Sequence, residues 1–160
     1  MKEFYESPLS SRYASEYMLR LFSPDKRYGT WRRLWVALAR AEHRLGLPVT
    51  DEQVAQLEAH VDDEIDYAAV AEWEKKLRHD VMAHIHTYAE LCPTAAPIIH
   101  LGATSCFVGD NTDILQMKEG LLQIKKLLVS LMRALADFAE REKDTPTLAY
   151  THFQAAQPTT

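Results

Sequence analysis

The chain has 160 residues, of which 47% are hydrophobic and 26% are charged, and its formal net charge is −5. This composition is typical of a soluble globular domain, and the acidic balance gives no overall attraction for nucleic acid or an anionic membrane. No apolar run approaches the ~18 residues of a membrane span, and the N-terminal residues lack the apolar core of a signal peptide. We therefore expect a cytoplasmic protein without nucleic-acid or membrane partners, with Cys92 and Cys106 as reduced thiols.

The first strong element is a helix predicted over residues 24–45. Ser23 supplies an N-cap directly before a proline, which suits the first helical position. Apolar residues then recur at one-face intervals that include Trp31 and Trp35 and end with Leu45. Gly46 is a typical residue just beyond a helix end. The pattern predicts an amphipathic helix.

Three shorter helices are predicted next. Thr50 and Gln53 have the spacing of a capping box and open the first of them. The other two are predicted over about 67–77 and 80–91, where the apolar pattern is again helical. Residues 94–109 are expected to form a loop.

The longest predicted helix is capped by Asp110 and runs to about residue 143. Apolar residues alternate along it at steps of three and four, which is a heptad-like stripe. The stripe consists of Ile114, Met117, Leu121, Ile124, Leu128, Leu131, Leu135 and Phe138. At ~1.5 Å per residue this helix measures roughly 50 Å, and no other predicted helix is long enough to cover it. We expect long partner helices from other sequence or other subunits; a bundle of shorter helices within the chain is the alternative.

Arg78, His79 and Asp80 form a polar cluster where one helix ends and another begins, with Asp80 as the expected N-cap. Free backbone N–H groups at a helix start favour an anion, and an arginine and a histidine there strengthen the site. The alternative is a surface ion pair between Arg78 and Glu74. Asp80 and His84 lie four residues apart and could share a metal, but no metal-binding motif accompanies them, so no metal is predicted.

Two further clusters also suit anions. Gly102 allows a close approach to the backbone, and Thr104 and Ser105 offer hydroxyls and N–H donors that suit a carboxylate; a loop that only caps the next helix is the alternative. Near the N-terminus, Arg12 and Tyr13 follow two serines and could bind a phosphate. An ordinary loop is the alternative there.

A histidine stands among hydroxyls and amides near the end of the chain, after the helix-breaking Pro146. His152 has a side chain that titrates near ~6.5 when unperturbed, which suits proton transfer. Thr151 and Gln154 could hold its ring by hydrogen bonds. A side chain without a chemical role is the alternative.

Taken together, the residues of these segments and the order of the segments along the chain resemble the adenylosuccinate lyase family, within the fumarase/aspartase superfamily. The likeness extends over essentially the whole chain. It is carried by Ser7–Ser15, Thr30–Trp35, Ala41–Pro48, Arg78–His84, Ile98–Ser105, Gly109–Asp113 and Thr151–Gln154.

The resemblance implies a cofactor-free β-elimination that breaks a C–N bond and releases fumarate. The implied substrates are adenylosuccinate and succinyl-aminoimidazole-carboxamide ribotide (SAICAR). His152 would be the general acid, with His79 supporting it, and Thr104 and Ser105 would hold the succinyl carboxylates. The remaining substrate contacts implied are Arg78, His79, Asp80 and Thr151, with Arg12 and Tyr13 at the phosphate.

The resemblance also implies an all-α homotetramer whose sites draw on three subunits. Residues 1–109 would be the N-terminal helical domain, and 110–160 the truncated start of a central, oligomeric helical bundle. Ala155 departs from a proline of the family. The family's base, a serine on a downstream loop, has no counterpart here, so the chain alone is expected to be inactive.

Two other functions fit parts of the sequence. One is another fumarate-releasing lyase, such as argininosuccinate lyase, although its substrate has no phosphate for Arg12 and Tyr13. The other is a non-catalytic helical module, complete at 160 residues, whose apolar stripe serves assembly alone.

Overall fold

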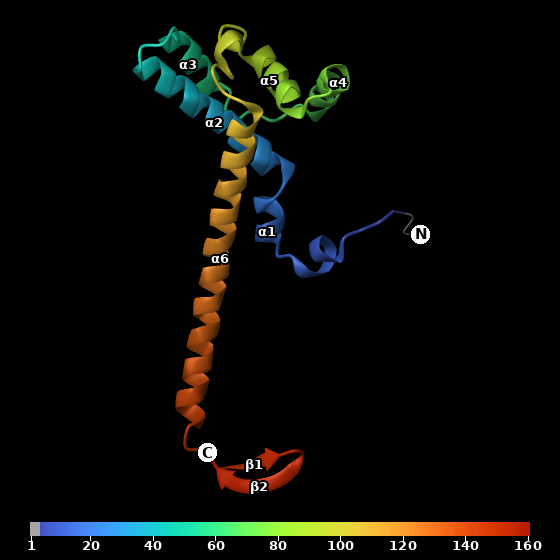
Figure 1. The fold of residues 1–160 in the computed structure, drawn as a ribbon, viewed down its shortest axis with the longest axis vertical. Helices are drawn as coiled ribbons and strands as arrows, with labels where there is room; N and C mark the ends of the chain where they lie inside the picture. The colour runs from blue at the N-terminus through green and yellow to red at the C-terminus, as the bar shows by residue number, and fades with distance from the viewer. Residues whose placement is uncertain (1–3) are drawn as a thin grey trace. The chain divides into compact units, whose positions relative to one another are not determined.

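Helices dominate the chain (Figure 1). The computed structural model describes residues 4–160, which divide into a first unit ending at Lys118 and a second unit, Glu119–Thr160. The elements are η1 (Leu9–Tyr13), α1 (Glu16–Leu21), α2 (Pro24–Arg44), α3 (Asp51–Ala59), α4 (Tyr67–Leu77), α5 (Asp80–Leu91), η2 (Ala96–Ile98), α6 (Ser105–Glu142), β1 (Thr147–Thr151) and β2 (Gln154–Thr159). The all-α class is confirmed, with a single two-stranded hairpin among the described residues.

The predicted starts of α2 and α3 are confirmed by their caps. The Ser23 hydroxyl accepts a hydrogen bond from the Lys26 N–H at 3.3 Å, so α2 begins where expected. At α3, the Thr50 hydroxyl accepts from the Gln53 N–H, and the Gln53 side chain accepts from the Thr50 N–H in return. These reciprocal bonds satisfy backbone donors that a helix start leaves unpaired.

The core of the first unit is built on one face of α2. Trp31 and Trp35 are 2% and 1% exposed, as their spacing predicted, whereas Leu45 is 78% exposed because it lies beyond the last residue of the helix. The Trp35 ring stacks on Tyr88 of α5, and the Tyr88 hydroxyl donates to the Leu57 carbonyl of α3 at 2.6 Å. The stacked rings thus link α5 to α2, and the Tyr88 hydrogen bond links α5 to α3.

The predicted bounds of α5 are confirmed, but its predicted N-cap and the predicted start of α6 were wrong. The N-cap of α5 is His79, one residue before Asp80, because the His79 ring accepts the capping bond. Helix α6 begins at Ser105, five residues before Asp110, inside the segment expected to be a loop. Val108 lies in this added turn and is fully buried in the core, so tertiary packing favours helix there despite the later capping signal.

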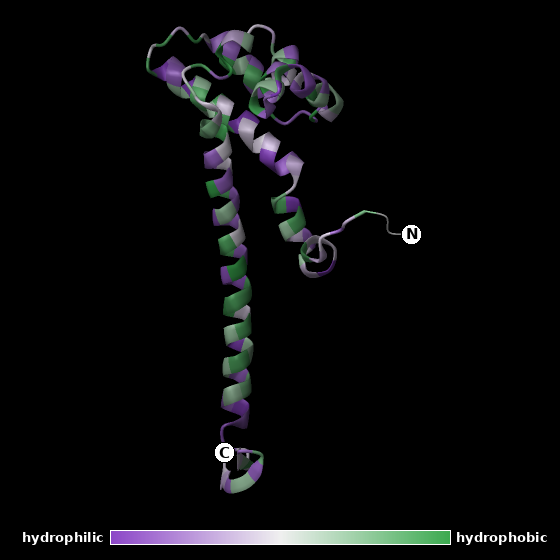
Figure 2. Ribbon diagram, turned by 45° about the vertical axis from the view of Figure 1, so that its right-hand side comes forward, coloured by the Kyte–Doolittle hydropathy of each residue, from purple (hydrophilic) through white to green (hydrophobic). Residues whose placement is uncertain are grey.

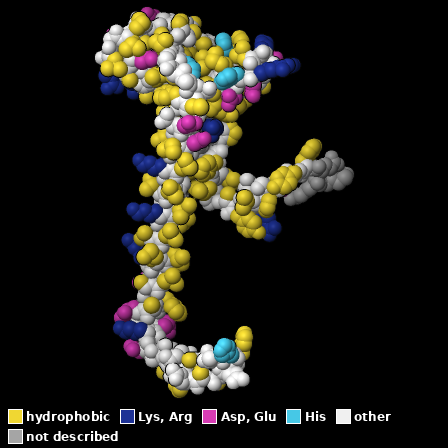
Figure 3. Space-filling view, in the orientation of Figure 1, with side chains coloured by type: hydrophobic (Ala, Val, Ile, Leu, Met, Phe, Trp, Pro, Cys, Tyr) yellow, Lys and Arg dark blue, Asp and Glu magenta, His cyan; other side chains and the backbone are white. Residues whose placement is uncertain are grey.

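The apolar stripe of α6 is confirmed as one exposed face. Its eight residues, from Ile114 to Phe138, are each between 45% and 66% exposed. Figure 2 shows hydrophobic residues recurring along α6, and Figure 3 shows apolar side chains at its surface. Within residues 4–160, the search for a helix suited to spanning a membrane finds none.

The end of the chain forms an antiparallel hairpin that the sequence did not indicate. Strands β1 and β2 pair with Thr151 opposite Gln154, and their register shifts between Leu148 and Tyr150. Threonine and tyrosine favour extended backbone, and only two residues link the strands.

Candidate functional site

The first predicted cluster lies at the tight junction between α4 and α5. Arg78 ends α4 with a left-handed backbone, at φ 54°, which is uncommon for a residue with a side chain. His79 then caps α5 through Nδ1, which accepts the Met82 N–H at 3.4 Å, and Asp80 Oδ1 accepts the Val81 N–H at 2.7 Å. The turn presents Arg78, His79 and Asp80 together as exposed side chains.

The His79 ring has two alternative partners at the same nitrogen. A neutral ring can accept the Met82 N–H at Nδ1, whereas a protonated ring donates from Nδ1, which lies 3.6 Å from Asp80 Oδ1. The two contacts exclude one another, since one needs a lone pair and the other a proton. His79 therefore has a local partner in either protonation state, which suits a residue that assists proton transfer.

The Arg78 guanidinium is available for a ligand. The bond that links Arg78 to Glu74 runs between backbone groups, from the Arg78 N–H to the Glu74 carbonyl at 2.6 Å. Among residues 4–160 no ion pair involves the Arg78 side chain, so the alternative of a Glu74–Arg78 ion pair was wrong. An unpaired guanidinium at the surface can bind a carboxylate or phosphate through two N–H groups.

No role was predicted for His100, which the structure places close enough to His79 for the two rings to interact electrostatically. Its Nδ1 accepts a hydrogen bond from the Trp35 Nε1–H at 3.0 Å. Burial, and secondarily the positive charge available to His79, lower the pKa of His100. The signal that could have found it is position, because His100 stands two residues before Gly102 in a polar loop.

The predicted carboxylate ligands lie at the end of the loop around Gly102, at Thr104, and at the first residue of α6, Ser105. Gly102 has φ 65°, in the left-handed region, and a Cβ there would lie 3.7 Å from Glu42 Oε1. Thr104 is exposed and Ser105 is partly buried. Neither hydroxyl makes a hydrogen bond within residues 4–160, so neither is used to cap α6, and both can bind a ligand.

Glu42 is an unexpected acid beneath this loop. The residue is 7% exposed, and its Oε2 atom is buried without a hydrogen-bond partner among the described residues. Burial raises the pKa of Glu42 because removal from water disfavours the charged carboxylate. Burial thus makes a negative charge on Glu42 less favourable beneath the loop that carries Gly102.

The side chains of Arg12 and Tyr13 lie against each other. Both are exposed at the end of η1, and the Arg12 Cζ atom lies 5.4 Å from the centre of the Tyr13 ring. In the part of the chain that the structure describes, no hydrogen bond, ion pair or ring contact joins them to Arg78 or His100. Their place at a phosphate stays a prediction.

His152 belongs to the second unit, at the tip of the hairpin. His152 and Phe153 are the two linking residues and have φ of 51° and 62°, both in the left-handed region. His152 is exposed, and Phe153 is 103% exposed. Thr151 and Gln154 pair as strand residues and make no bond to the ring among the described residues, so their expected role in holding it was wrong.

His84 is a core residue. It stacks on the Tyr28 ring with centroids 3.9 Å apart, and burial, followed by the positive charge of Arg32, lowers the pKa of His84 to about 4. A search of residues 4–160 finds no group of three or more potential metal ligands. His84 and Asp80 therefore do not converge with a third ligand.

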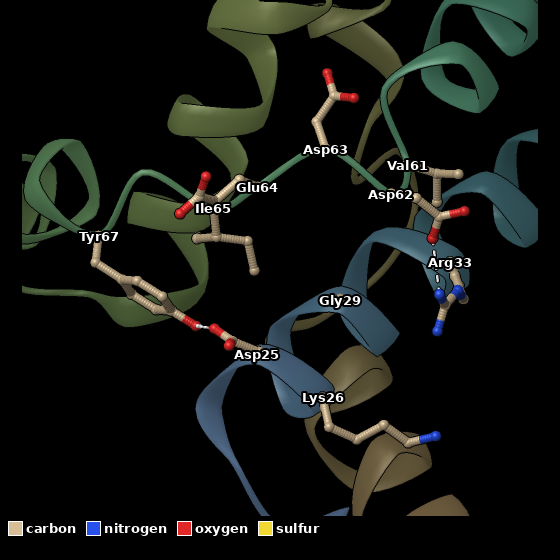
Figure 4. A pocket seen from close by; sticks show the side chains of 10 residues that line it. All are labelled: Asp25, Lys26, Gly29, Arg33, Val61, Asp62, Asp63, Glu64, Ile65 and Tyr67. Atoms are coloured by element: carbon tan, nitrogen blue, oxygen red, sulfur yellow. Dashed lines mark hydrogen bonds and ion pairs between the residues drawn. The ribbon is translucent and has the colours of Figure 1, made fainter. Parts of the chain in front are cut away.

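A separate pocket of about 500 Å³ lies beside the start of α2 (Figure 4). The Tyr67 hydroxyl donates to Asp25 at 2.5 Å, and Arg33 pairs with Asp62 at 2.7 Å. Its lining residues are Asp25, Lys26, Gly29, Arg33, Val61, Asp62, Asp63, Glu64, Ile65 and Tyr67. It contains no residue predicted for the site, and its acidic lining disfavours an anionic substrate.

A protein-family model described as lyase matches residues 11–160 of the chain. The chain belongs to this lyase family. It is 53% identical to the adenylosuccinate lyase of Saccharomyces cerevisiae and 49% identical to that of Schizosaccharomyces pombe, in each case over 98% of the chain and 33% of the relative. The resemblance predicted from the sequence is confirmed, and the chain spans about a third of the length of these relatives, their N-terminal third.

The fold of the chain also matches that of solved lyases. A fumarate lyase from Mesorhizobium sp. BNC1 superposes with a TM-score of 0.80 at 27% identity. The match covers 91% of this chain and 34% of that one. The structural match thus extends over the same share of a longer protein as the sequence match does.

Proposed function

We propose that the chain is the N-terminal part of an enzyme that cleaves adenylosuccinate to AMP and fumarate, in purine nucleotide biosynthesis. The same site would convert SAICAR to the corresponding carboxamide ribotide and fumarate. The observation that carries this proposal is the 53% identity to an adenylosuccinate lyase across 98% of the chain. The exposed, unpaired donors of the α4–α5 junction and the Gly102 loop support it.

The proposed reaction is a β-elimination. A base removes a proton from the carbon next to a carboxylate, the electron pair forms the C=C bond of fumarate, and the C–N bond breaks. The departing nitrogen takes a proton from His152, with His79 supporting that step. Thr104 and Ser105 hold the carboxylates and stabilise the negative charge that develops there.

Local cations explain how an acidic chain binds a polyanion. The formal net charge of −5 repels adenylosuccinate at long range. Arg78, which has no acidic partner within residues 4–160, and Arg12, with Tyr13 beside it, would bind the anionic groups at short range. Asp80 and Thr151 complete the proposed set of substrate contacts.

The proposal extends to assembly and location. The exposed stripe of α6 supports a homotetramer in which long helices from several subunits pack together, with the domain boundary at residues 109 and 110. Sedimentation equilibrium of the complete enzyme tests the tetramer, and cell fractionation tests the predicted cytoplasmic location.

The deciding experiment is fumarate release by a chimera. This chain replaces the matching third of the Saccharomyces cerevisiae adenylosuccinate lyase, and the chimera is assayed with adenylosuccinate, SAICAR and argininosuccinate. We expect release from the first two substrates only, and no release by the chain alone. A folded chimera of native oligomeric size that releases no fumarate would contradict the proposal.

A further inference from the structure

The hydrogen bond between Trp35 and His100 joins two residues that are far apart in the sequence. The Trp35 Nε1–H points at His100 Nδ1, and the nitrogens are 3.0 Å apart. Trp35 is 1% exposed and packed on three sides by aromatic neighbours, with centroids 6.2 Å from each of Trp31, Tyr88 and His100. The donor is therefore held in one place by the core.

This bond determines where the His100 proton lies. An indole N–H can donate but cannot accept, so Nδ1 of His100 must keep its lone pair. A neutral ring then carries its proton on Nε2, and an imidazolium ring would set two N–H groups against each other. No hydrogen-bond partner of Nε2 lies within residues 4–160, so the Nε2–H is available as a donor.

We propose that Trp35 is a positioning residue that locks His100 in the neutral Nε2–H form, so that the loop carrying Thr104 and Ser105 presents a ring N–H donor to an anionic ligand. The catalytic importance of this lock rests on the proposed function. The position of the proton on the His100 ring can be tested without any assay of activity.

Other groups near His100 act in the same direction or stay neutral. His79, at the N-cap of α5, opposes a second positive charge on His100 and so lowers its pKa. Glu42 of α2 lies against Gly102, and its burial favours the uncharged form. No carboxylate of residues 4–160 pairs with the His100 ring, so the Trp35 bond is the interaction that selects between the two neutral tautomers.

The chain contains a matched control on the same helix. Trp31 lies one helical turn before Trp35, is 2% exposed, and contacts a histidine ring edge-on, that of His84. Its Nε1 atom makes no hydrogen bond in the part of the chain that the structure describes. Replacing either tryptophan by phenylalanine removes a similar buried volume, but only Trp35→Phe removes a bond to His100.

The direct test is nitrogen NMR of the chain with ¹⁵N-labelled histidine, from about pH 5 to 8. In the unmodified chain and in Trp31→Phe, we expect His100 Nδ1 to show the shift of an unprotonated nitrogen and Nε2 that of a protonated one. In Trp35→Phe we expect both tautomers and a higher His100 pKa. The inference is overturned if Nδ1 is protonated in the unmodified chain, or if the two variants give the same His100 signals.

The functional test uses the same variants in the chimera. Trp35→Phe should lower kcat/KM for adenylosuccinate by up to about tenfold near neutral pH, the cost of a weakened hydrogen bond from the His100 Nε2–H to a charged ligand group. The loss should shrink toward acidic pH, where protonation of His100 restores the Nε2–H. Trp31→Phe should keep the pH profile of the parent. An inactive parent chimera with the expected NMR signals would refute the proposed function and leave the Trp35 lock intact; equal pH profiles of the two variants would refute its catalytic importance.

Discussion

The Gly102 region and the terminal hairpin hold their proposed site residues by different means. His79 and His100 are attached to the core of the first unit through a helix cap and a bond from Trp35, which is 1% exposed. His152 sits on a two-residue turn with left-handed backbone, and its ring makes no hydrogen bond among the described residues. The core of this chain therefore orients the first pair, whereas His152 needs other surroundings to orient it.

The comparison predicts that substitutions at the exposed positions change turnover and leave stability alone. His152→Ala, made in the chimera, should lower kcat by about 10³-fold through loss of the general acid, with little change in substrate affinity. Its thermal unfolding midpoint should match that of the parent, because the side chain is exposed. His60→Ala, at a half-buried histidine outside the proposed site, is the control for turnover. Near-normal turnover of His152→Ala would remove His152 from the mechanism.

In the packed region the largest expected effect is on acid stability. Burial lowers the pKa of His84 to about 4 in the folded state, below the ordinary value of 6.5. The unfolded chain therefore binds the proton first, and stability present above about pH 6.5 is lost as pH falls toward 4. In the parent, the free energy of unfolding should fall by on the order of 2 to 3 kcal/mol over this pH range, and in His84→Phe this fall should be absent. Denaturant unfolding at several pH values measures the difference. A pH dependence unchanged from the parent would contradict this account.

A smaller effect is expected at the phosphate position. Arg12→Ala should weaken binding of adenylosuccinate about tenfold, by removing a charge-assisted hydrogen bond, while kcat stays close to that of the parent. The KM and the inhibition constant of AMP measure this effect. Arg20→Ala is a matched control, because Arg20 is exposed and pairs with Glu16. Equal constants for the two variants would exclude Arg12 from the site.

The smallest expected effect concerns the buried acid beneath the Gly102 loop. The folded-state pKa of Glu42 is raised, so the stability it permits at acidic pH is lost as pH rises through that value. Glu42→Gln should thus match the parent near pH 4 and be more stable by up to about 1 kcal/mol at pH 7. Glu58→Gln, in which Glu58 loses an exposed ion pair with Arg40, should show no such gain. A Glu42→Gln chain less stable than the parent at pH 7 would contradict a raised pKa of Glu42.

Short-range sequence patterns predicted many of the helices correctly. The caps at Ser23 and Thr50 marked helix starts correctly, because each bond lies within a few residues of sequence. The start of α6 was missed because Val108 is buried by residues distant in the sequence. The role of His100 was missed for the same reason, since its partner Trp35 lies 65 residues away.

By itself the sequence determined the helical class, the apolar stripe of α6, the polar clusters and the likeness to adenylosuccinate lyases. Hydrophobic periodicity and helix capping depend on residues close together in the sequence, and the likeness to a family is visible in the residues of each segment. The tertiary structure was needed to show that a buried indole holds His100. It was also needed to show that, among the residues described, Glu42 Oε2 has no hydrogen-bond partner beneath Gly102 and Arg78 has no acidic partner. These depend on which side chains meet across the core, which local spacing does not specify.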